Sequence, residues 1–228
     1  MFDQSTLRGR IIAATLNLAA ERPWREVTLL DIAEATGVTL VDLKQEFASK
    51  SEILAAFTKA VDDEVLRRAP KREANSTPRD ALFEILMTRF DVLGPYKQAI
   101  RSILGDVRVP DPRMACTLLA SQHWMLQAAG IDTSSLSGRI KVGGLAGLYA
   151  SVMRTWLEDD DPGLARTMAA LDRRLRRGEQ ALGNLKDIKA CLCRAGRAFS
   201  SFARGRRPGG GTGFEAGPRP EETSGANI

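Results

Sequence analysis

The sequence of 228 residues predicts an all-α protein. Apolar residues recur at three- and four-residue spacing almost throughout the chain, which is the period of an amphipathic helix. Valine, isoleucine and threonine never alternate with polar residues for the length of a strand. Prolines, glycines and capping residues divide this pattern into about nine helices.

The N-terminal part of the chain is predicted to hold four closely spaced helices. The first spans 7–21 and is ended by Pro23. Each of the next three begins with a capping box, in which a Ser or Thr pairs with an acidic residue three positions later. The three boxes are Thr28 with Asp31, Thr39 with Asp42, and Ser49 with Glu52. Gly37 ends the second helix, because glycine readily adopts the left-handed conformation found at helix C-termini.

Longer helices follow a polar segment over 69–77, which we interpret as a linker. Pro78 suits the first position of a helix and opens one that continues to Leu93. Four more helices are predicted over 95–107, 113–129, 136–157 and 164–182. Residues 205–228 are rich in Gly and Pro and too poor in apolar residues to offset their backbone entropy, so we expect a disordered tail.

The formal net charge of +5 is not carried by the N-terminal helices. Residues 1–50 hold six basic and seven acidic side chains, a net charge of −1. Residues 186–207 hold seven basic side chains and one acidic one, a net charge of +6. A positive surplus is typical of proteins that bind nucleic acid or an anionic membrane surface, and here it lies near the C-terminus.

Composition also limits the class of protein. Three cysteines and one histidine are too few for a disulfide framework or most zinc sites. No apolar run approaches the ~20 residues that span a bilayer, and the N-terminus lacks the order of a signal peptide, so we expect a cytoplasmic protein. The sequence shows no nucleophile–base pair, phosphate-cradling glycine loop or metal-ligand cluster. We therefore expect no enzyme, no catalytic residue, no metal and no cofactor.

Residues 29–39 have the pattern of two amphipathic helices joined by a tight turn. Ala33 is small enough for the second helix to cross closely, Gly37 suits the turn, and Val38 packs beneath it. A helix crossed in this way can lie in the major groove of DNA. Short helix pairs are common, so the spacing alone is compatible with a DNA-binding motif and with an ordinary helix pair.

Three motifs in register make this pattern specific: IIAA at 11–14, DIAEATGV at 31–38 and FASKSEIL at 47–54. Over residues 7–66 the chain resembles the N-terminal domain of TetR-family transcriptional repressors, and its later helices are similar in layout to that family's C-terminal domain. The resemblance implies a homodimer that binds double-stranded operator DNA and releases it when a small molecule enters the C-terminal domain. The expected TetR-like organisation is a helix-turn-helix domain over 1–66 and a helical ligand-binding and dimerisation domain over 77–184.

The resemblance also assigns roles to seven residues. Thr28 would cap the first helix of the motif, and Thr39 would cap the recognition helix and touch a phosphate. Lys50 would contact the DNA backbone. Four residues would face the groove: Leu40, Val41, Lys44 and Gln45.

Three positions depart from the family pattern, which usually has a small hydroxyl residue at Asp42, a tyrosine at Lys44 and an aromatic residue, histidine or tyrosine at Glu46. Carboxylates near phosphates are repelled. We favour a capping role for Asp42, because the Thr39 box needs a carboxylate there. Lys44 can replace the tyrosine's phosphate contact, and Glu46 has one conceivable DNA role, accepting a hydrogen bond from a cytosine amino group.

The C-terminal domain is predicted to hold a pocket for a small apolar ligand with few polar groups, since no convergent cluster of charged residues is apparent. Ordinary core packing is the alternative for each candidate residue. The candidates, on helices around the domain centre, are Phe83, Met87, Phe90, Leu119, Trp124, Met125, Leu148, Tyr149 and Met153.

The candidate dimer interface consists of the two long helices, over 137–158 and 162–182. Gly143 and Gly147 lie four residues apart in an apolar helix, so that one face can approach another helix closely. Glycine in a helix costs about 1 kcal/mol, which suggests a packing need. Dimerisation and a tight crossing within the chain both satisfy that need.

The segment 186–204 is predicted to be a basic amphipathic helix, which can lie on an anionic membrane surface or dock on the domain. Its apolar stripe includes Ile188, Leu192, Phe199 and Phe202. With the motifs RFDVLGPY at 89–96 and WLEDD at 156–160, residues 79–182 resemble the lipid-binding accessory protein of ubiquinone biosynthesis, a family that shares the repressor fold without DNA binding. An isoprenoid- or quinone-binding accessory protein is therefore the alternative function.

Overall fold

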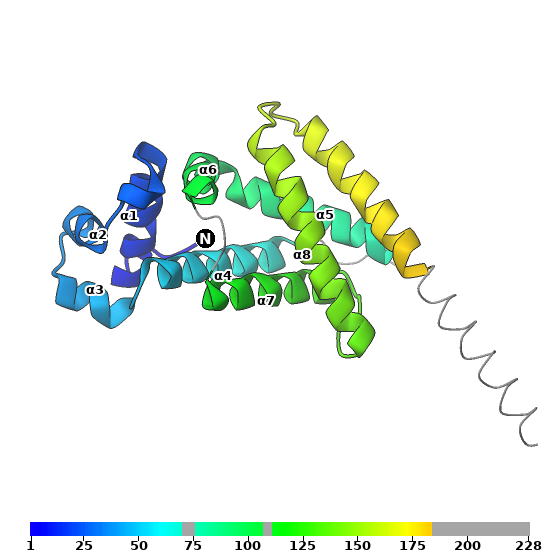
Figure 1. The fold of residues 1–228 in the computed structure, drawn as a ribbon, viewed down its shortest axis with the longest axis horizontal. Coiled ribbons are helices and arrows are strands. Elements are labelled where there is room, and N and C mark those ends of the chain that lie inside the picture. The colour runs from blue at the N-terminus through cyan, green and yellow to red at the C-terminus, as the bar shows by residue number, and fades with distance from the viewer. Residues whose placement is uncertain (70–75, 107–110, 184–228) are drawn as a thin grey trace, which may run out of the picture. The chain divides into compact units, whose positions relative to one another are not determined.

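The computed structural model describes residues 1–69, 76–106 and 111–183 of the chain (Figure 1). All regular structure in these residues is helical, as the sequence predicts. The elements are α1 (Leu7–Glu21), the 3₁₀ turn η1 (Trp24–Glu26), α2 (Leu29–Thr36), α3 (Leu40–Glu46), α4 (Lys50–Arg68), α5 (Pro78–Leu93), the 3₁₀ turn η2 (Gly94–Tyr96), α6 (Lys97–Asp106), α7 (Pro112–Ala128) and α8 (Leu136–Leu157). A last helix covers residues 165–183.

Most helix starts coincide with the predicted capping residues. The first two capping boxes close with both reciprocal hydrogen bonds. The third box is only half correct, because the Ser49 hydroxyl accepts from the Glu52 amide but the Glu52 carboxylate accepts from the amide of Ala48, at 2.7 Å. Glutamate is one methylene longer than aspartate, so its carboxylate can reach the residue before the cap.

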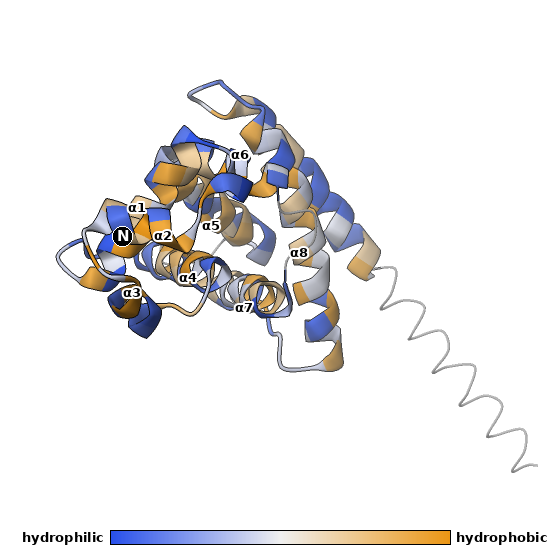
Figure 2. Cartoon of the chain, turned by 60° about the vertical axis from the view of Figure 1, so that its left-hand side comes forward, coloured by the Kyte–Doolittle hydropathy of each residue, from blue (hydrophilic) through white to orange (hydrophobic). Residues whose placement is uncertain are grey.

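Helix α4 connects the helix-turn-helix to the later helices, and it packs against α1 as well as against α5 and α7. Its buried residues therefore cover more than one face, and they include Phe57, Val61 and Val65 together with the charged Asp62. One apolar core extends from the first three helices through α4 to α5, α7 and α8. Figure 2 shows the mixture of hydrophobic and hydrophilic residues around these helices that amphipathic packing requires.

Residues Met1–Leu182 form one unit by their contacts. The expected boundary after residue 66 falls in the last turn of α4, so the division into domains stays a prediction. The expected amphipathic helix over 186–204 and the tail over 205–228 lie outside the described residues. The apolar stripe lies outside them too, with Ile188, Leu192, Phe199 and Phe202. Within the described ranges, no helix has the length and apolar character needed to cross a membrane.

Candidate nucleic-acid interface

Helices α2 and α3 form a helix-turn-helix with the expected tight turn. Gly37 has a φ of 68°, the left-handed conformation that favours glycine, and its amide donates to the carbonyl of Glu34 at 3.1 Å. The next amide, that of Val38, donates to the carbonyl of Ala33 at 3.0 Å. Ile32 and Ala33 are buried and anchor α2 to the core. The turn thus fixes the direction in which α3 leaves α2.

Helix α3 exposes the four residues that were predicted to face DNA. Leu40 is 48% exposed and Val41 65% exposed, and Lys44 and Gln45 are also exposed. On the opposite side Leu43 and Phe47 are each only 1% exposed and hold the helix on the core. At about 100° per residue, positions 40, 41, 44 and 45 fall within one arc of the helix.

The two capping threonines use their hydroxyl protons inside the capping boxes. The Thr39 hydroxyl donates to Asp42 at 2.7 Å, and the Thr28 hydroxyl donates to Asp31 at 2.6 Å. Hydrogen bonds from Thr39 lower the pKa of Asp42, and those from Thr28, with the Arg22 guanidinium 3.0 Å away, lower the pKa of Asp31 to about 2. The favoured capping role of Asp42 is confirmed. A phosphate contact by Thr39 would compete with that box for the proton.

The side chain of Glu46 is held by α1. The Arg8 guanidinium donates to the backbone carbonyl of Glu46 at 2.9 Å and lies 3.5 Å from the carboxylate of Glu46. The same guanidinium carbon lies 4.2 Å from the centroid of the Phe47 ring, a cation–π arrangement. Arg8 therefore ties α1 to the end of α3. Sequence reasoning missed this role, because the two residues are far apart in the chain.

Lys50 braces the segment between α1 and α2. Its ammonium donates to the carbonyls of Val27 at 2.6 Å and Trp24 at 3.0 Å, and it lies 4.2 Å from the Trp24 ring centroid. Burial lowers the pKa of Lys50, and the negative charges of Asp106 and Asp31 act in the opposite direction. Because an ammonium has three donors, one N–H remains for the expected DNA backbone contact.

Helix α6 holds the same segment from the other direction. The amide of Trp24 donates to the Ser102 hydroxyl at 3.0 Å, and the amide of Arg25 donates to the Asp106 carboxylate at 2.8 Å. Two other residues of α6 bind the end of α8 and the residues that follow it. Lys97 donates to the Asp159 carbonyl at 2.5 Å, and Arg101 donates to the Leu157 carbonyl. Polar contacts of α6 therefore connect the end of α8 to the segment between α1 and α2.

The predicted pocket residues do not gather at one cavity. Among the nine, Phe90, Met125 and Tyr149 are buried in the core, while Leu119 and Trp124 are exposed on α7. Four are partly buried and pack against the core: Phe83, Met87, Leu148 and Met153.

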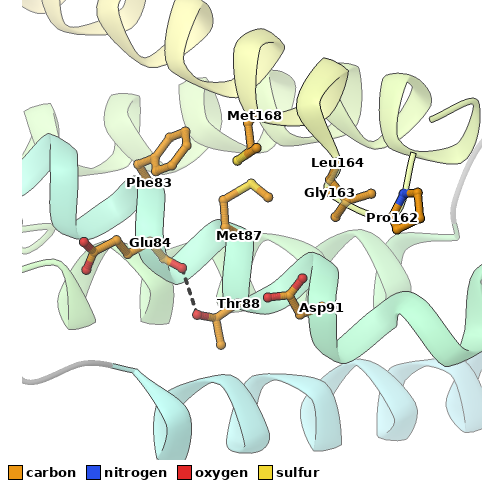
Figure 3. A pocket seen from close by; sticks show the side chains of 9 residues that line it. All are labelled: Phe83, Glu84, Met87, Thr88, Asp91, Pro162, Gly163, Leu164 and Met168. Carbon is orange, nitrogen blue, oxygen red and sulfur yellow. Dashed lines mark hydrogen bonds between the residues drawn. The ribbon is translucent and has the colours of Figure 1, made fainter. Parts of the chain in front are cut away.

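A groove of about 460 Å³ lies between α5 and the start of the last helix. Figure 3 shows Met87 of α5 facing Met168 across it, with Phe83 alongside. Of the predicted pocket residues, only Phe83 and Met87 line the groove. Its other lining residues are Glu84, Thr88, Asp91, Pro162, Gly163, Leu164 and Met168.

A buried polar cluster lies where the sequence suggested few polar groups. Arg89 of α5 donates to the Asp62 carboxylate and, at 3.0 Å, to the Tyr149 hydroxyl. Asp62 also accepts from the Ser121 hydroxyl at 2.7 Å. The expectation that no charged residues converge is therefore wrong. The signal was present, because Arg89 falls in the apolar stripe of α5 between Leu86 and Leu93.

The glycines of α8 are not explained by packing within the chain. A Cβ atom built on Gly143, Gly144 or Gly147 meets no atom of the described chain within 4 Å. The alternative of a tight crossing within the chain is therefore wrong for the part that the structure describes. Leu136 and Ile140 are 71% and 47% exposed and continue the face of Gly143 and Gly147 toward the start of α8.

Comparison with known proteins identifies the helix-turn-helix. Residues 11–57 match the model of the family described as bacterial regulatory proteins, tetR family. The chain is 25% identical over 162 residues to the HTH-type transcriptional activator FasR of Mycolicibacterium smegmatis, an alignment that covers 68% of this chain and 74% of that protein.

Solved structures share the fold. A TetR transcriptional regulator from Nitrosomonas europaea ATCC 19718 superposes with a TM-score of 0.60 at 20% identity, over 75% of this chain and 97% of that one. A TetR regulator from Rhodococcus sp. RHA1 gives 0.58 at 20% identity, over 76% and 96%. No group of His, Cys, Asp and Glu that could hold a metal occurs among the described residues. Residues 11–57 thus carry the helix-turn-helix of the tetR family of bacterial regulatory proteins, and the described helices share the fold of these solved regulators.

Proposed function

We propose that this protein is a homodimeric repressor that inserts α3 into the major groove of operator DNA and leaves the operator when a small, largely apolar molecule binds its C-terminal helices. The exposed face of α3, with Leu40, Val41, Lys44 and Gln45, carries this proposal. These side chains are exposed in the part of the chain that the structure describes, whereas the opposite face anchors the helix through Leu43. Exposed apolar side chains on a short, fixed helix suit base edges in a groove.

The proposed dimer uses α8 and the helix over 165–183. No described residue lies within 4 Å of a Cβ built on Gly143 or Gly147, and Leu136 and Ile140 on the same face of α8 are exposed. A second copy would cover this apolar face and let two helices approach closely at the glycines. A two-fold dimer also places two recognition helices on successive turns of a duplex, which two half-sites require.

The groove between α5 and residues 162–168 is the proposed ligand site. Its volume of about 460 Å³ is within the range of small-molecule sites. Met87, Met168 and Phe83 supply apolar surface, while Glu84 and Asp91 supply two carboxylates. A ligand with an apolar body and a positive group would complement this lining.

A chain of polar contacts supports coupling between the groove and α3. The turn that lines the groove begins just after Leu157, whose carbonyl is held by Arg101. Helix α6 carries Arg101 in its middle and Asp106 at its end, where Asp106 holds Arg25. A ligand that moves the turn would therefore shift α6 and the segment before α2.

A mobility-shift titration against the DNA flanking the protein's own gene tests DNA binding. We expect specific binding of about 10⁻⁸ M or tighter at physiological salt, with log affinity falling linearly with log salt. Val41→Asp should abolish specific binding, because it places a carboxylate on the DNA-facing side of α3. Ala120→Asp, which adds the same charge at an exposed position of α7, is the matched control and should bind normally. Binding that is equal for specific and random DNA would contradict the proposal.

The sign of regulation needs a separate measurement, since the relative FasR is named an activator. We propose repression, in which a bound dimer blocks the promoter. A reporter behind the bound promoter should then rise when the gene is deleted. A fall would instead indicate activation by the same DNA-binding surface.

The membrane-surface alternative is not favoured by these comparisons, which match transcriptional regulators. The segment on which this alternative depends, 186–204, lies outside the described residues. Co-flotation of the full chain with anionic liposomes, together with no shift of any DNA, would favour the alternative over the repressor.

A further inference from the structure

The exposed recognition surface of α3 is partly apolar. Two of its four exposed side chains, Leu40 and Val41, are aliphatic and lie in the first turn of the helix. Leu40 is 48% exposed and Val41 is 65% exposed among the described residues. Hydrocarbon side chains cannot hydrogen-bond a base or a phosphate, so their contribution must come from apolar contact.

The acidic side chains of α3 are already engaged by other residues. Asp42 accepts from the Thr39 hydroxyl and amide, at 2.7 Å and 3.1 Å. Glu46 is held by Arg8 of α1, which lies 3.5 Å from its carboxylate. A carboxylate is the side chain that reads the cytosine amino group in the major groove. Helix α3 therefore offers no unengaged carboxylate for reading cytosine.

The base edges of the major groove present one apolar group, the C5-methyl of thymine. We propose that Leu40 and Val41 read thymine methyl groups, so that each operator half-site has adjacent A·T pairs where α3 enters the groove. Gln45 lies on the same exposed arc and matches adenine, the partner base, because its carboxamide can pair with adenine N6 and N7. This inference rests on the proposed function, and it adds the base class that the helix selects.

The test removes the methyl group without changing any hydrogen bond. The full-length protein first selects its operator from random duplex DNA. Each thymine of the selected half-site is then replaced in turn by deoxyuridine, and the dissociation constant is measured by fluorescence anisotropy. We expect one or two adjacent thymines at which the loss of the methyl weakens binding about 3- to 10-fold, consistent with loss of one buried methyl contact. Thymines elsewhere in the half-site should change affinity by less than about twofold.

The protein variants assign the methyl contact to particular side chains. In Val41→Ala and Leu40→Ala the deoxyuridine penalty should shrink to less than about twofold at the position that each residue reads. Both side chains are exposed, so these variants should keep the wild-type Tm. Lys44→Ala is the matched control on the same face. It should weaken binding to all sequences while the full deoxyuridine penalty remains.

The outcomes separate this inference from the proposed function. Specific binding with no deoxyuridine penalty at any position would overturn methyl reading and leave DNA binding intact. A penalty that persists in both alanine variants would also overturn it, because other residues would then read the methyl. Failure to select any sequence would overturn the proposed function itself, and with it this inference.

Discussion

The guanidinium of Arg89 on α5 forms a buried ion pair with the carboxylate of Asp62 on α4. The side chains are 4% and 10% exposed, and hydroxyls of Tyr149 and Ser121 complete their hydrogen bonds. Burial raises the pKa of Tyr149, so its hydroxyl stays protonated at neutral pH. Four helices thus meet at one polar cluster. This cluster fixes α4, which begins shortly after the recognition helix α3 ends.

Removing one partner of this pair should destabilise the protein strongly. Asp62→Ala leaves the Arg89 charge buried without a counter-charge, and we expect a loss of about 3–5 kcal/mol in the free energy of unfolding. The double variant Asp62→Leu with Arg89→Met should lose much less, because no charge is then left unpaired. Urea unfolding followed by circular dichroism measures both. Equal losses in the single and double variants would show that packing, rather than charge, determines the cost.

The ion pair also illustrates what the sequence could predict. Local signals placed the helices correctly, since capping boxes, prolines and Gly37 act through neighbouring residues. The four residues of α3 expected to face DNA came instead from the resemblance to the TetR family, and all four are exposed. The pocket prediction was much weaker, because whether Phe90 or Trp124 lies inside depends on which helices pack against it. Asp62 was not recognised, since α4 is packed against several helices and its second buried face does not follow the main apolar stripe.

The acid stability of α2 should depend on Asp31. Its pKa falls from an ordinary value of 3.8 to about 2 in the folded protein, through the Thr28 hydrogen bonds and the Arg22 charge. Because the folded pKa is the lower one, this contribution to stability is complete above about pH 4 and is lost as the pH falls toward 2. Asp31→Asn keeps an acceptor for the cap but does not titrate. The Tm of the wild type should therefore fall more steeply than that of the variant between pH 5 and pH 2, and parallel curves would exclude this role.

The glycine face of α8 gives opposite expectations for folding and for dimerisation. Gly143→Ala with Gly147→Ala adds two methyl groups where the described residues leave open space, and better helix propensity should stabilise the monomer by up to ~1 kcal/mol per site. The same methyl groups would separate two helices that meet there, so we expect at least about a tenfold weaker dimer by sedimentation equilibrium. Gly105→Ala, also in open space but on α6, outside the proposed interface, is the control. A dimer as tight as that of the wild type would remove α8 from the interface.

The contact between α6 and the segment before α2 can be tested without a ligand. Asp106→Ala removes the acceptor of the Arg25 amide, which should then exchange with solvent deuterium at least about tenfold faster. Exchange in α3 should also rise modestly if α6 positions the helix-turn-helix. Asp160→Ala is the matched control, because Asp160 is exposed and lies 3.7 Å from Lys97 at the other end of α6. Unchanged protection of Arg25 would show that the Asp106 contact does not hold this segment.

Glu46 should reduce affinity for DNA by charge alone. Its carboxylate stays beside α3 because Arg8 holds it, and a negative charge near phosphates is unfavourable. Glu46→Gln should therefore strengthen binding to operator and to random DNA by about 3- to 10-fold at about 50 mM salt, with a smaller gain at about 200 mM, where charges are better screened. Loss of this half-exposed pair should cost no more than about 1 kcal/mol of stability. Weaker and less selective binding in Glu46→Gln would instead show that the carboxylate accepts a hydrogen bond from a cytosine amino group.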